Sequence, residues 1–415
     1  MPNRSLRRFE IDSAEHLRDH LRAGGSLVDH ILHGVDLRGI SAIERADVTN
    51  CLLLGCVFES VEQRHALERR GAYVFPPFGE LPFDPYRHRL YSAGELLEGY
   101  DEGGYVNTRD FRIYTYFDRA RKSQRGTALR DGLAQRLHDF AIDDAMAEFI
   151  ERHGGRTVVG VMGGHGTRRD DPDYAKVVKM CRELTRRGFL VATGGGPGVM
   201  EAGNLGAYLA NFEDDGVIDA ALEILVEAPS FDGGCAEGTP EYLRAIANYI
   251  SAASRCREAL GASALQTRYR ADGPPRASLA VPTWFYGHEP TNLFCDHVAK
   301  YFSNGLREDV LLAVSRGGVV FAPGSAGTLQ EVFMDLAQNH YATFVDRSPM
   351  VFLDSERFGT VFRLIGEFIE TRQMTESYGD LVAMFDDPMD IVAFIEANPP
   401  RQRALATALY DLLDE

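Results

Sequence analysis

Three glycine-rich turns, each directly after a short apolar run, constrain the fold of this chain more than any other feature. The apolar runs cover residues 157–162, 189–193 and 318–322, and the turns after them cover residues 163–167, 194–200 and 323–331. Helical periodicity follows the first two turns, at about residues 174–187 and 198–209. Strands that alternate with helices are typical of a parallel sheet with right-handed crossovers. The sequence therefore predicts an α/β fold with a Rossmann-like, doubly wound, mostly parallel sheet.

Other segments extend this prediction on both sides. Further strands are expected at residues 221–226, 278–282 and 349–353, and the aromatic alternation within residues 86–118 indicates one or two more. Residues 128–153 have the spacing of one long helix, and residues 358–415 are expected to be helical.

The N-terminal part has a different pattern of apolar residues. Val48, Leu53 and Phe58 lie five residues apart, a spacing that resembles a pentapeptide-repeat β-coil with inward apolar side chains. We therefore expect four regions. They are an N-terminal accessory module (1–80), a linker and helical region (81–153), the Rossmann-like catalytic core (154–355) and C-terminal helices (356–415).

Composition restricts the partners. Acidic residues outnumber basic ones by 61 to 44, for a net charge of −17, which disfavours binding to nucleic acid or to an anionic membrane surface. No apolar signal-peptide core and no long apolar run is present, so we expect a cytoplasmic protein. The six cysteines have no metal-ligand spacing; we expect reduced thiols, no metal and no cofactor.

The glycine turns themselves predict an anion site. Glycine lets the backbone approach an anion closely, and free N–H groups at a helix start bind it. The turns contain neither the dinucleotide fingerprint GxGxxG after the first strand nor a Gly-Lys-Ser/Thr P-loop. We therefore expect a monophosphate ligand, held by two converging helix N-termini.

Two of these turns also carry a family resemblance. GGGPGVMEAGNLGA (residues 194–207) and PGSAGTLQE (residues 323–331) resemble the signature motifs of the LONELY GUY family, Rossmann-like phosphoribohydrolases long mislabelled lysine decarboxylases. The resemblance covers about residues 156–355, and the long flanks look like the bacterial pyrimidine/purine nucleotide 5′-monophosphate nucleosidase branch. It implies hydrolysis of a nucleoside 5′-monophosphate to free base and ribose 5-phosphate. Relatives also imply a homo-oligomer and allow for a nucleotide effector.

The resemblance assigns residues to roles. The phosphate would be bound by Gly195, Gly196, Gly198, Gly324, Ser325, Gly327 and Thr328. Ser325 departs from the second glycine that is usual in the family. Glu331 matches the catalytic glutamate. Counting back to the catalytic arginine reaches Glu308, so Arg307 takes that role only with a one-residue deletion near residues 316–317.

The chemistry fits these assignments. Cleavage of an N-glycosidic bond passes through an oxocarbenium-like ribose, which the Glu331 carboxylate would stabilise. We expect the helix N-terminus to keep Glu331 ionised. Arg307, His288 or a water would supply a proton to the departing base. Contacts with base or sugar are predicted at Gly163, Gly164, Met200, Glu201, Trp284 and His288, although the aromatic loop around Trp284 would equally serve a structural role.

Two other functions compete with this hypothesis. One is a sensor that binds a nucleotide or alarmone without cleaving it. The other is a pyridoxal-phosphate lysine decarboxylase, which requires a desolvated lysine amine. None of the lysines (Lys122, Lys176, Lys179 and Lys300) has a sequence context that predicts burial, and Asp110 and its acidic neighbours are expected on solvated faces.

Overall fold

The computed structural model describes residues 9–123, 126–153, 157–264, 277–287, 289–341, 343, 346–371 and 378–402. The chain divides into two compact units. The first unit comprises Met1–Arg89 and Ser123–Ala145, and the second comprises Leu90–Lys122 and Met146–Glu415. Each has its own hydrophobic core.

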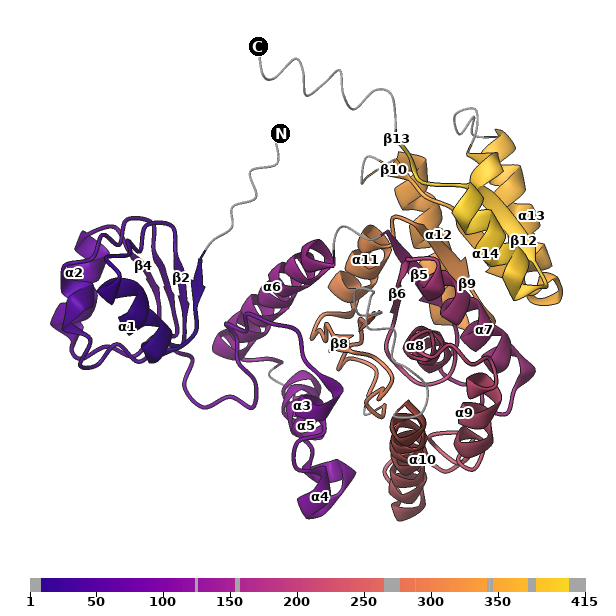
Figure 1. Ribbon diagram of the computed structural model, residues 1–415, viewed down its shortest axis with the longest axis horizontal. Coiled ribbons are helices and arrows are strands. Elements are labelled where there is room, and N and C mark those ends of the chain that lie inside the picture. The colour runs from indigo at the N-terminus through magenta and orange to yellow at the C-terminus, as the bar shows by residue number, and fades with distance from the viewer. Residues whose placement is uncertain are drawn as a thin grey trace, which may run out of the picture. The chain divides into compact units, whose positions relative to one another are not determined.

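The first unit is a coil of short parallel strands (Figure 1). The strands are β1 (Glu10–Ile11), β2 (Ile31–His33), β3 (Leu52–Leu54) and β4 (Tyr73–Phe75). Glu10 pairs with Ile31, Ile31 with Leu52 and Leu52 with Tyr73, so each coil takes 21 residues. The helix α1 (Ala14–Arg22), the 3-10 helix η1 (Ser41–Glu44) and the helix α2 (Val61–Arg69) connect successive strands.

Backbone conformation repeats with the same period. Asp29, Asn50 and Gly71 have φ values of 58°, 57° and 95°, and each lies two residues before the first residue of its strand. Aspartate, asparagine and glycine adopt this left-handed conformation at the least cost. Val48 and Leu53 are buried and Phe58 is half-buried, so the five-residue spacing did identify inward side chains. The repeat length differs from the pentapeptide prediction. Helices connect successive strands, so each coil takes 21 residues.

The second unit is built on a seven-stranded sheet whose order is β12-β11-β9-β5-β6-β7-β8. All neighbouring pairs are parallel. The strands are β5 (Val158–Met162), β6 (Leu190–Thr193), β7 (Ser278–Ala280), β8 (His297–Val298), β9 (Gly318–Phe321), β11 (Met350–Leu353) and β12 (Val382–Phe385). From β5 the order runs through β6 in one direction and through β9 in the other, which makes the β5–β9 boundary the topological switch point. The Rossmann-like, doubly wound prediction is confirmed.

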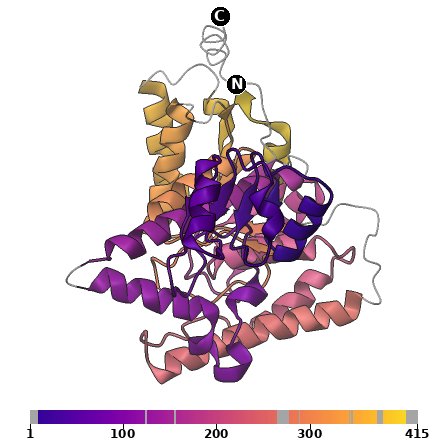
Figure 2. The ribbon, with the colours of Figure 1, turned by 90° about the vertical axis from the view of Figure 1, so that its left-hand side faces the viewer.

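Helices connect these strands. They are α7 (Pro172–Arg186), α8 (Val199–Leu209), α9 (Val217–Leu225), α10 (Pro240–Ala264), α11 (Asn304–Val314), α12 (Ala326–Tyr341) and α13 (Ser355–Thr371), and α14 (Pro388–Ala397) follows the last strand, β12. The longest of them, α10, is seen along its length in Figure 2. The close approach of α7 and α8 depends on Gly206, because a Cβ there would overlap the carbonyl oxygen of Val178.

The remaining elements are short or lie before the sheet. They are α3 (Ala93–Leu96), α4 (Tyr100–Gly103), η2 (Tyr105–Asn107), α5 (Arg109–Lys122), α6 (Leu129–Arg152), η3 (Gly379–Leu381) and the antiparallel pair β10 (Asp346–Arg347) and β13 (Arg401–Gln402). Among the described helices, none has the length and apolar composition of a membrane span.

Three element predictions were wrong. Residues 221–226, expected as a strand, belong mostly to α9, where Val217, Ile218, Ala221 and Leu225 are buried at helical spacing. The aromatic alternation near residue 115 lies in α5, which buries Asp110, Ile113 and Phe117. The C-terminal region, expected to be all helical, also contributes the edge strand β12.

Candidate functional site

The three glycine-rich turns meet at the carboxyl ends of β9, β5 and β6, which are adjacent strands. The N–H of Gly164 donates to the carbonyl of Pro323 (3.0 Å), and the N–H of Val199 donates to the carbonyl of Gly164 (3.1 Å). Gly164 thus connects the first turn to both of the others. Ligands of open α/β sheets bind at this edge, next to the switch point.

The glycines at this junction leave no room for side chains. A Cβ on Gly164 would lie 3.1 Å from the Cα of Gly324, and one on Gly324 would lie 2.9 Å from the N of Gly164. Gly198 has a φ of 71°, and a Cβ there would overlap the carbonyl oxygen of Gly164. Close packing of these backbones is what places their N–H groups near one another.

Two helices begin at the junction. α8 starts at Val199, directly after Gly198, and α12 starts at Ala326 within the third turn. Their N-terminal N–H groups carry partial positive charge. Gly324, Ser325 and Gly327 are exposed, whereas Thr328 is buried in the first turn of α12. The arrangement can bind a small anion.

Arg307 and Glu331 form an ion pair beside the second turn. Nη1 of Arg307, in α11, lies 3.1 Å from Oε1 of Glu331, in α12, and the two residues are only 8% and 9% exposed. A Cβ on Gly194 would lie 3.6 Å from Nη2 of the same guanidinium. Nε of Arg307 is buried without a hydrogen-bond partner among the described residues. The guanidinium therefore keeps donor capacity for a ligand.

Glu308, the residue reached by simple counting, takes a different position. Its carboxylate accepts hydrogen bonds from Asn304 (2.8 Å) and Gln330 (2.7 Å). The structure thus brings Arg307, and not Glu308, to the carboxylate of Glu331.

The electrostatics of Glu331 differ from our expectation. Burial raises the pKa of Glu331, and the negative charge of Glu308 acts in the same direction, whereas Arg307 opposes them. We expected the helix N-terminus to keep this group ionised; instead the pKa of Glu331 is shifted upward, which makes its carboxylate a better proton acceptor than a free glutamate. Desolvation thus outweighs both the charge and the hydrogen bond that Arg307 supplies.

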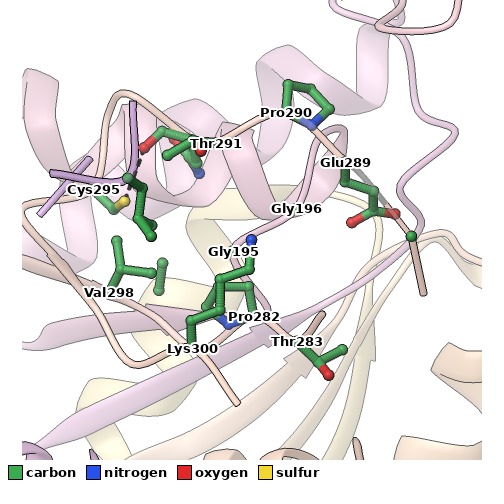
Figure 3. Close-up of a pocket in the computed structure, with 14 residues that line it drawn as sticks. Gly195, Gly196, Pro282, Thr283, Glu289, Pro290, Thr291, Cys295, Val298 and Lys300 are labelled. Carbon is green, nitrogen blue, oxygen red and sulfur yellow. Dashed lines mark hydrogen bonds between the residues drawn. The ribbon is translucent and has the colours of Figure 1, made fainter. Parts of the chain in front are cut away.

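A small pocket adjoins the second turn (Figure 3). Gly195, Gly196, Thr283, Glu289 and Lys300 are among the residues that line it. Its volume of about 10 Å³ is enough for one water molecule, so it forms a polar floor beside the turn and does not enclose a whole ligand. Figure 3 shows the Glu289 side chain turned into this pocket, toward Gly196.

Sequence reasoning missed Glu289. A Cβ on Gly196 would lie 2.6 Å from its Oε2, and Nδ1 of His165 lies 3.8 Å from its Oε1. Burial raises the pKa of Glu289, while His165, Arg307 and Lys300 lower it by smaller amounts. The signal was present, because Glu289 lies in the loop after β7 that the aromatic residues had already singled out.

Trp284 does not have the expected role. It is 1% exposed, and its Nε1 donates to Oδ1 of Asp110 (2.7 Å). Asp110 also contacts Nζ of Lys300 (2.8 Å) and accepts from Thr291 (2.9 Å). Trp284 is therefore a buried anchor with no free face for a base, and the predictions of solvated Asp110 and unburied Lys300 were wrong.

Glu201 is also a structural residue. Its carboxylate pairs with Arg169 (2.6 Å) and accepts from the hydroxyls of Tyr174 (2.8 Å) and Tyr249 (2.6 Å). Because it is 2% exposed and fully engaged, the predicted sugar contact is corrected. This cluster anchors the first turn of α8.

The remaining residues predicted to contact the base or the sugar are Met200, Gly163 and His288. The side chain of Met200 lies across the second turn. A Cβ added to Gly194 would lie 2.6 Å from its Sδ, and a Cβ added to Gly196 would lie 2.8 Å from its Cε. Gly163 packs against Val199, at the start of α8. His288 lies outside the described residues.

Comparison with known families adds one finding to this geometry. Residues 156–218 match the model of the SLOG cluster4 family (LDcluster4). The matched segment contains β5, α7, β6 and α8, and with them the first two glycine turns. This SLOG-like segment supports a nucleotide-related Rossmann-like fold. The match does not extend to residues 323–331, and the narrower LONELY GUY resemblance stays a prediction.

A solved structure is weakly similar to this chain. The molybdenum cofactor binding protein from the phototrophic bacterium Rippkaea orientalis is similar at 14% identity and a TM-score of 0.33, over 58% of this chain and 96% of that one. At this TM-score the likeness says nothing of a ligand for this chain. A search of curated proteins found no match.

Proposed function

We propose that this protein is a nucleoside 5′-monophosphate phosphoribohydrolase, a hydrolase that releases the free base and ribose 5-phosphate. The observation that carries the proposal is the buried Arg307–Glu331 ion pair, which lies beside the second of three converging glycine turns. The SLOG-like segment supports a nucleotide as the ligand.

The phosphate would bind where α8 and α12 begin. Backbone N–H groups of Gly196, Gly198, Gly324 and Gly327 and the hydroxyls of Ser325 and Thr328 are the proposed donors, whereas the N–H of Gly195 donates to Oγ1 of Thr193 (3.1 Å). A chain with a net charge of −17 repels anions at long range, so binding has to come from such local dipoles and from Arg307. The exposed position of Gly324–Gly327 leaves this edge open to a ligand.

Glu331 would act on the sugar. Positive charge develops on the ribose as the N-glycosidic bond breaks, and a carboxylate in a desolvated site stabilises that charge strongly. Arg307 holds the Glu331 carboxylate in place through Nη1, which leaves Nε and Nη2 to contact the substrate.

The test is a hydrolysis panel. Purified protein is incubated with AMP, GMP, CMP and UMP, and ribose 5-phosphate is measured. We expect turnover of at least one nucleotide, none of the matching nucleoside without phosphate, and a loss of at least about 100-fold in Glu331→Gln. Glu227→Gln is the matched control, because Glu227 is an exposed partner of Arg255 in the same unit.

The same panel separates the alternative functions. Calorimetric binding of a nucleotide without any release of ribose 5-phosphate would contradict the hydrolase and favour a sensor. A full rate in Glu331→Gln would remove the role proposed for that carboxylate.

A further inference from the structure

A second carboxyl group lies at the opposite end of the glycine turn from Arg307. The Gly194 end of the turn faces Nη2 of Arg307, and the Gly196 end faces Oε2 of Glu289. Two residues of chain span at most about 7 Å, so both side chains flank one short stretch of backbone. Glu331 lies on the far side of Arg307, 3.1 Å from its Nη1. The turn therefore has a carboxyl group near each end: Glu331, through Arg307, at the Gly194 end, and Glu289 at the Gly196 end.

The backbone of Glu289 is held in place. The hydroxyl of Tyr105, which is buried, donates to the carbonyl of Glu289 (2.9 Å). The side chain keeps some exposure, and among the described residues Nδ1 of His165 is the basic group that lies within 4 Å of its carboxyl group, at 3.8 Å. This distance is too long for a hydrogen bond, so the carboxyl proton stays available to a ligand.

Cleavage of the substrate calls for a proton at this end of the site. A nucleobase leaves poorly as an anion, and an acid within hydrogen-bond reach accelerates its departure. The basic groups of His165, Arg307 and Lys300 act on Glu289, and the hydroxyls of Tyr105 and Tyr242 interact with it electrostatically. Burial outweighs these basic groups and raises the pKa of Glu289, which favours the protonated form that an acid catalyst needs.

We propose that Glu289 is the general acid that protonates the departing nucleobase, while Glu331 stabilises the ribose and accepts a proton from the attacking water. This inference rests on the proposed function and assigns the proton donor that the family resemblance left open. The C1′–N bond breaks with its electron pair on the base, which takes the proton of Glu289. Water adds its oxygen to C1′ and gives a proton to Glu331, and solvent returns one proton from Glu331 to Glu289. The sum is nucleotide plus water to base plus ribose 5-phosphate.

A substrate that needs no acid tests this assignment. 4-Nitrophenyl β-D-ribofuranoside 5-phosphate keeps the sugar and the phosphate, but its nitrophenolate leaves without protonation. Glu289→Gln should lower the turnover of the best nucleotide by about 10²–10⁴-fold and leave the nitrophenyl substrate within about threefold of wild type. Glu331→Gln should slow both substrates, and Glu227→Gln neither.

Two further measurements separate catalysis from folding. Glu289→Asp keeps a carboxyl group and should recover part of the nucleotide activity, with unchanged nucleotide binding by calorimetry. The wild-type kcat should fall as the pH rises through the pKa of Glu289, because the acid loses its proton, and this limb should be absent in Glu289→Gln.

Each outcome decides between the two proposals. Equal losses on both substrates in Glu289→Gln, or no loss on the nucleotide, would overturn the general-acid role and leave the hydrolase intact. A wild-type protein that releases ribose 5-phosphate from no nucleotide would overturn the hydrolase, and the acid role with it.

Discussion

Single residues decide the chemistry of the second unit, and Arg307 carries two tasks at once. It neutralises Glu331 and faces the second glycine turn. Arg307→Ala should lower kcat/KM for the best nucleotide by about 10–100-fold, the size of one lost charge-assisted hydrogen bond. Steady-state kinetics measure the change, with Arg255→Ala on the surface as the control.

The conservative variant sharpens this prediction. Arg307→Lys keeps the charge but loses the planar fork that contacts a carboxylate and a ligand together. We expect only partial activity; full activity in Arg307→Ala would contradict a role for the guanidinium in binding.

Asp335 makes a prediction about stability and pH. It is fully buried in α12, where Asn339 donates to Oδ1 (3.1 Å), and burial raises its pKa from 3.8 to about 8. Between these two values the unfolded chain releases the proton that the folded chain keeps. The free energy of unfolding should therefore fall by about 1.4 kcal/mol per pH unit from about pH 4 to about pH 8.

Asp335→Asn tests this slope. The amide has the same shape and no charge to desolvate, so the variant should be more stable than wild type near pH 8 and should match it near pH 4. Urea unfolding across this pH range gives both curves. Parallel curves for the two proteins would contradict a buried, protonated Asp335.

The sequence located single residues unevenly. Glu331 could be found because its motif places an acid one turn after Thr328 on a helix, whereas counting along the chain reached Glu308 and gave Arg307 only with a one-residue deletion. The burial of Asp110, Lys300 and Glu201 could not, because charged residues are buried only when distant partners meet them. Asp110 meets Lys300 across 190 positions, and Glu201 meets Arg169 across 32.

At the scale of elements, the glycine turns depend on the absence of side chains. In Gly198→Ala the added Cβ meets the carbonyl groups of Gly164 and His165 at a φ of 71°. We expect this variant to lose stability by more than about 1 kcal/mol and to lose nucleotide turnover, because the first and second turns must separate. Thermal unfolding and the hydrolysis panel measure the two effects.

A matched glycine controls for the substitution itself. Gly359 lies in α13 with open space where its Cβ would be, so Gly359→Ala should be neutral or slightly stabilising. A Gly198→Ala protein as stable and active as Gly359→Ala would contradict the close approach of the turns.

The elements themselves were predictable where apolar runs were flanked by glycine. Residues 157–162, 189–193, 278–282, 318–322 and 349–353 form strands because buried parallel strands are continuously apolar. Residues 221–226 are equally apolar but belong mostly to a helix, and a short apolar run does not distinguish the two. β12 was missed because its edge position leaves it only half-buried and its sequence less apolar.

At the scale of the molecule, two separate cores predict two unfolding events. Leu53 is fully buried in the core of the first unit, and Ile246 is fully buried in that of the second. Leu53→Ala and Ile246→Ala should each destabilise their own unit by about 2–5 kcal/mol. Differential scanning calorimetry should show each variant shifting a different transition; one shared transition that both variants lower would contradict the division.

The architecture of the second unit could be predicted from the sequence, whereas the first was predicted as a β-coil with the wrong repeat length. Strand–helix alternation predicts a mostly parallel sheet, because parallel neighbours require crossovers. The 21-residue repeat was not predicted because its strands are only two or three residues long and the helix that connects them changes from α1 to η1 to α2. Its clearest marker is the spacing of Asp29, Asn50 and Gly71, which depends on backbone conformation.

Such a coil can in principle be lengthened by duplication. Residues 30–50 run from one strand to the next in matching register, so a tandem copy would add one more rung without disturbing the hydrogen bonds on either side. Each rung would extend the sheet by about 4.8 Å, the spacing between neighbouring strands. The length of the first unit can thus be changed, by evolution or by design, in steps of one whole coil.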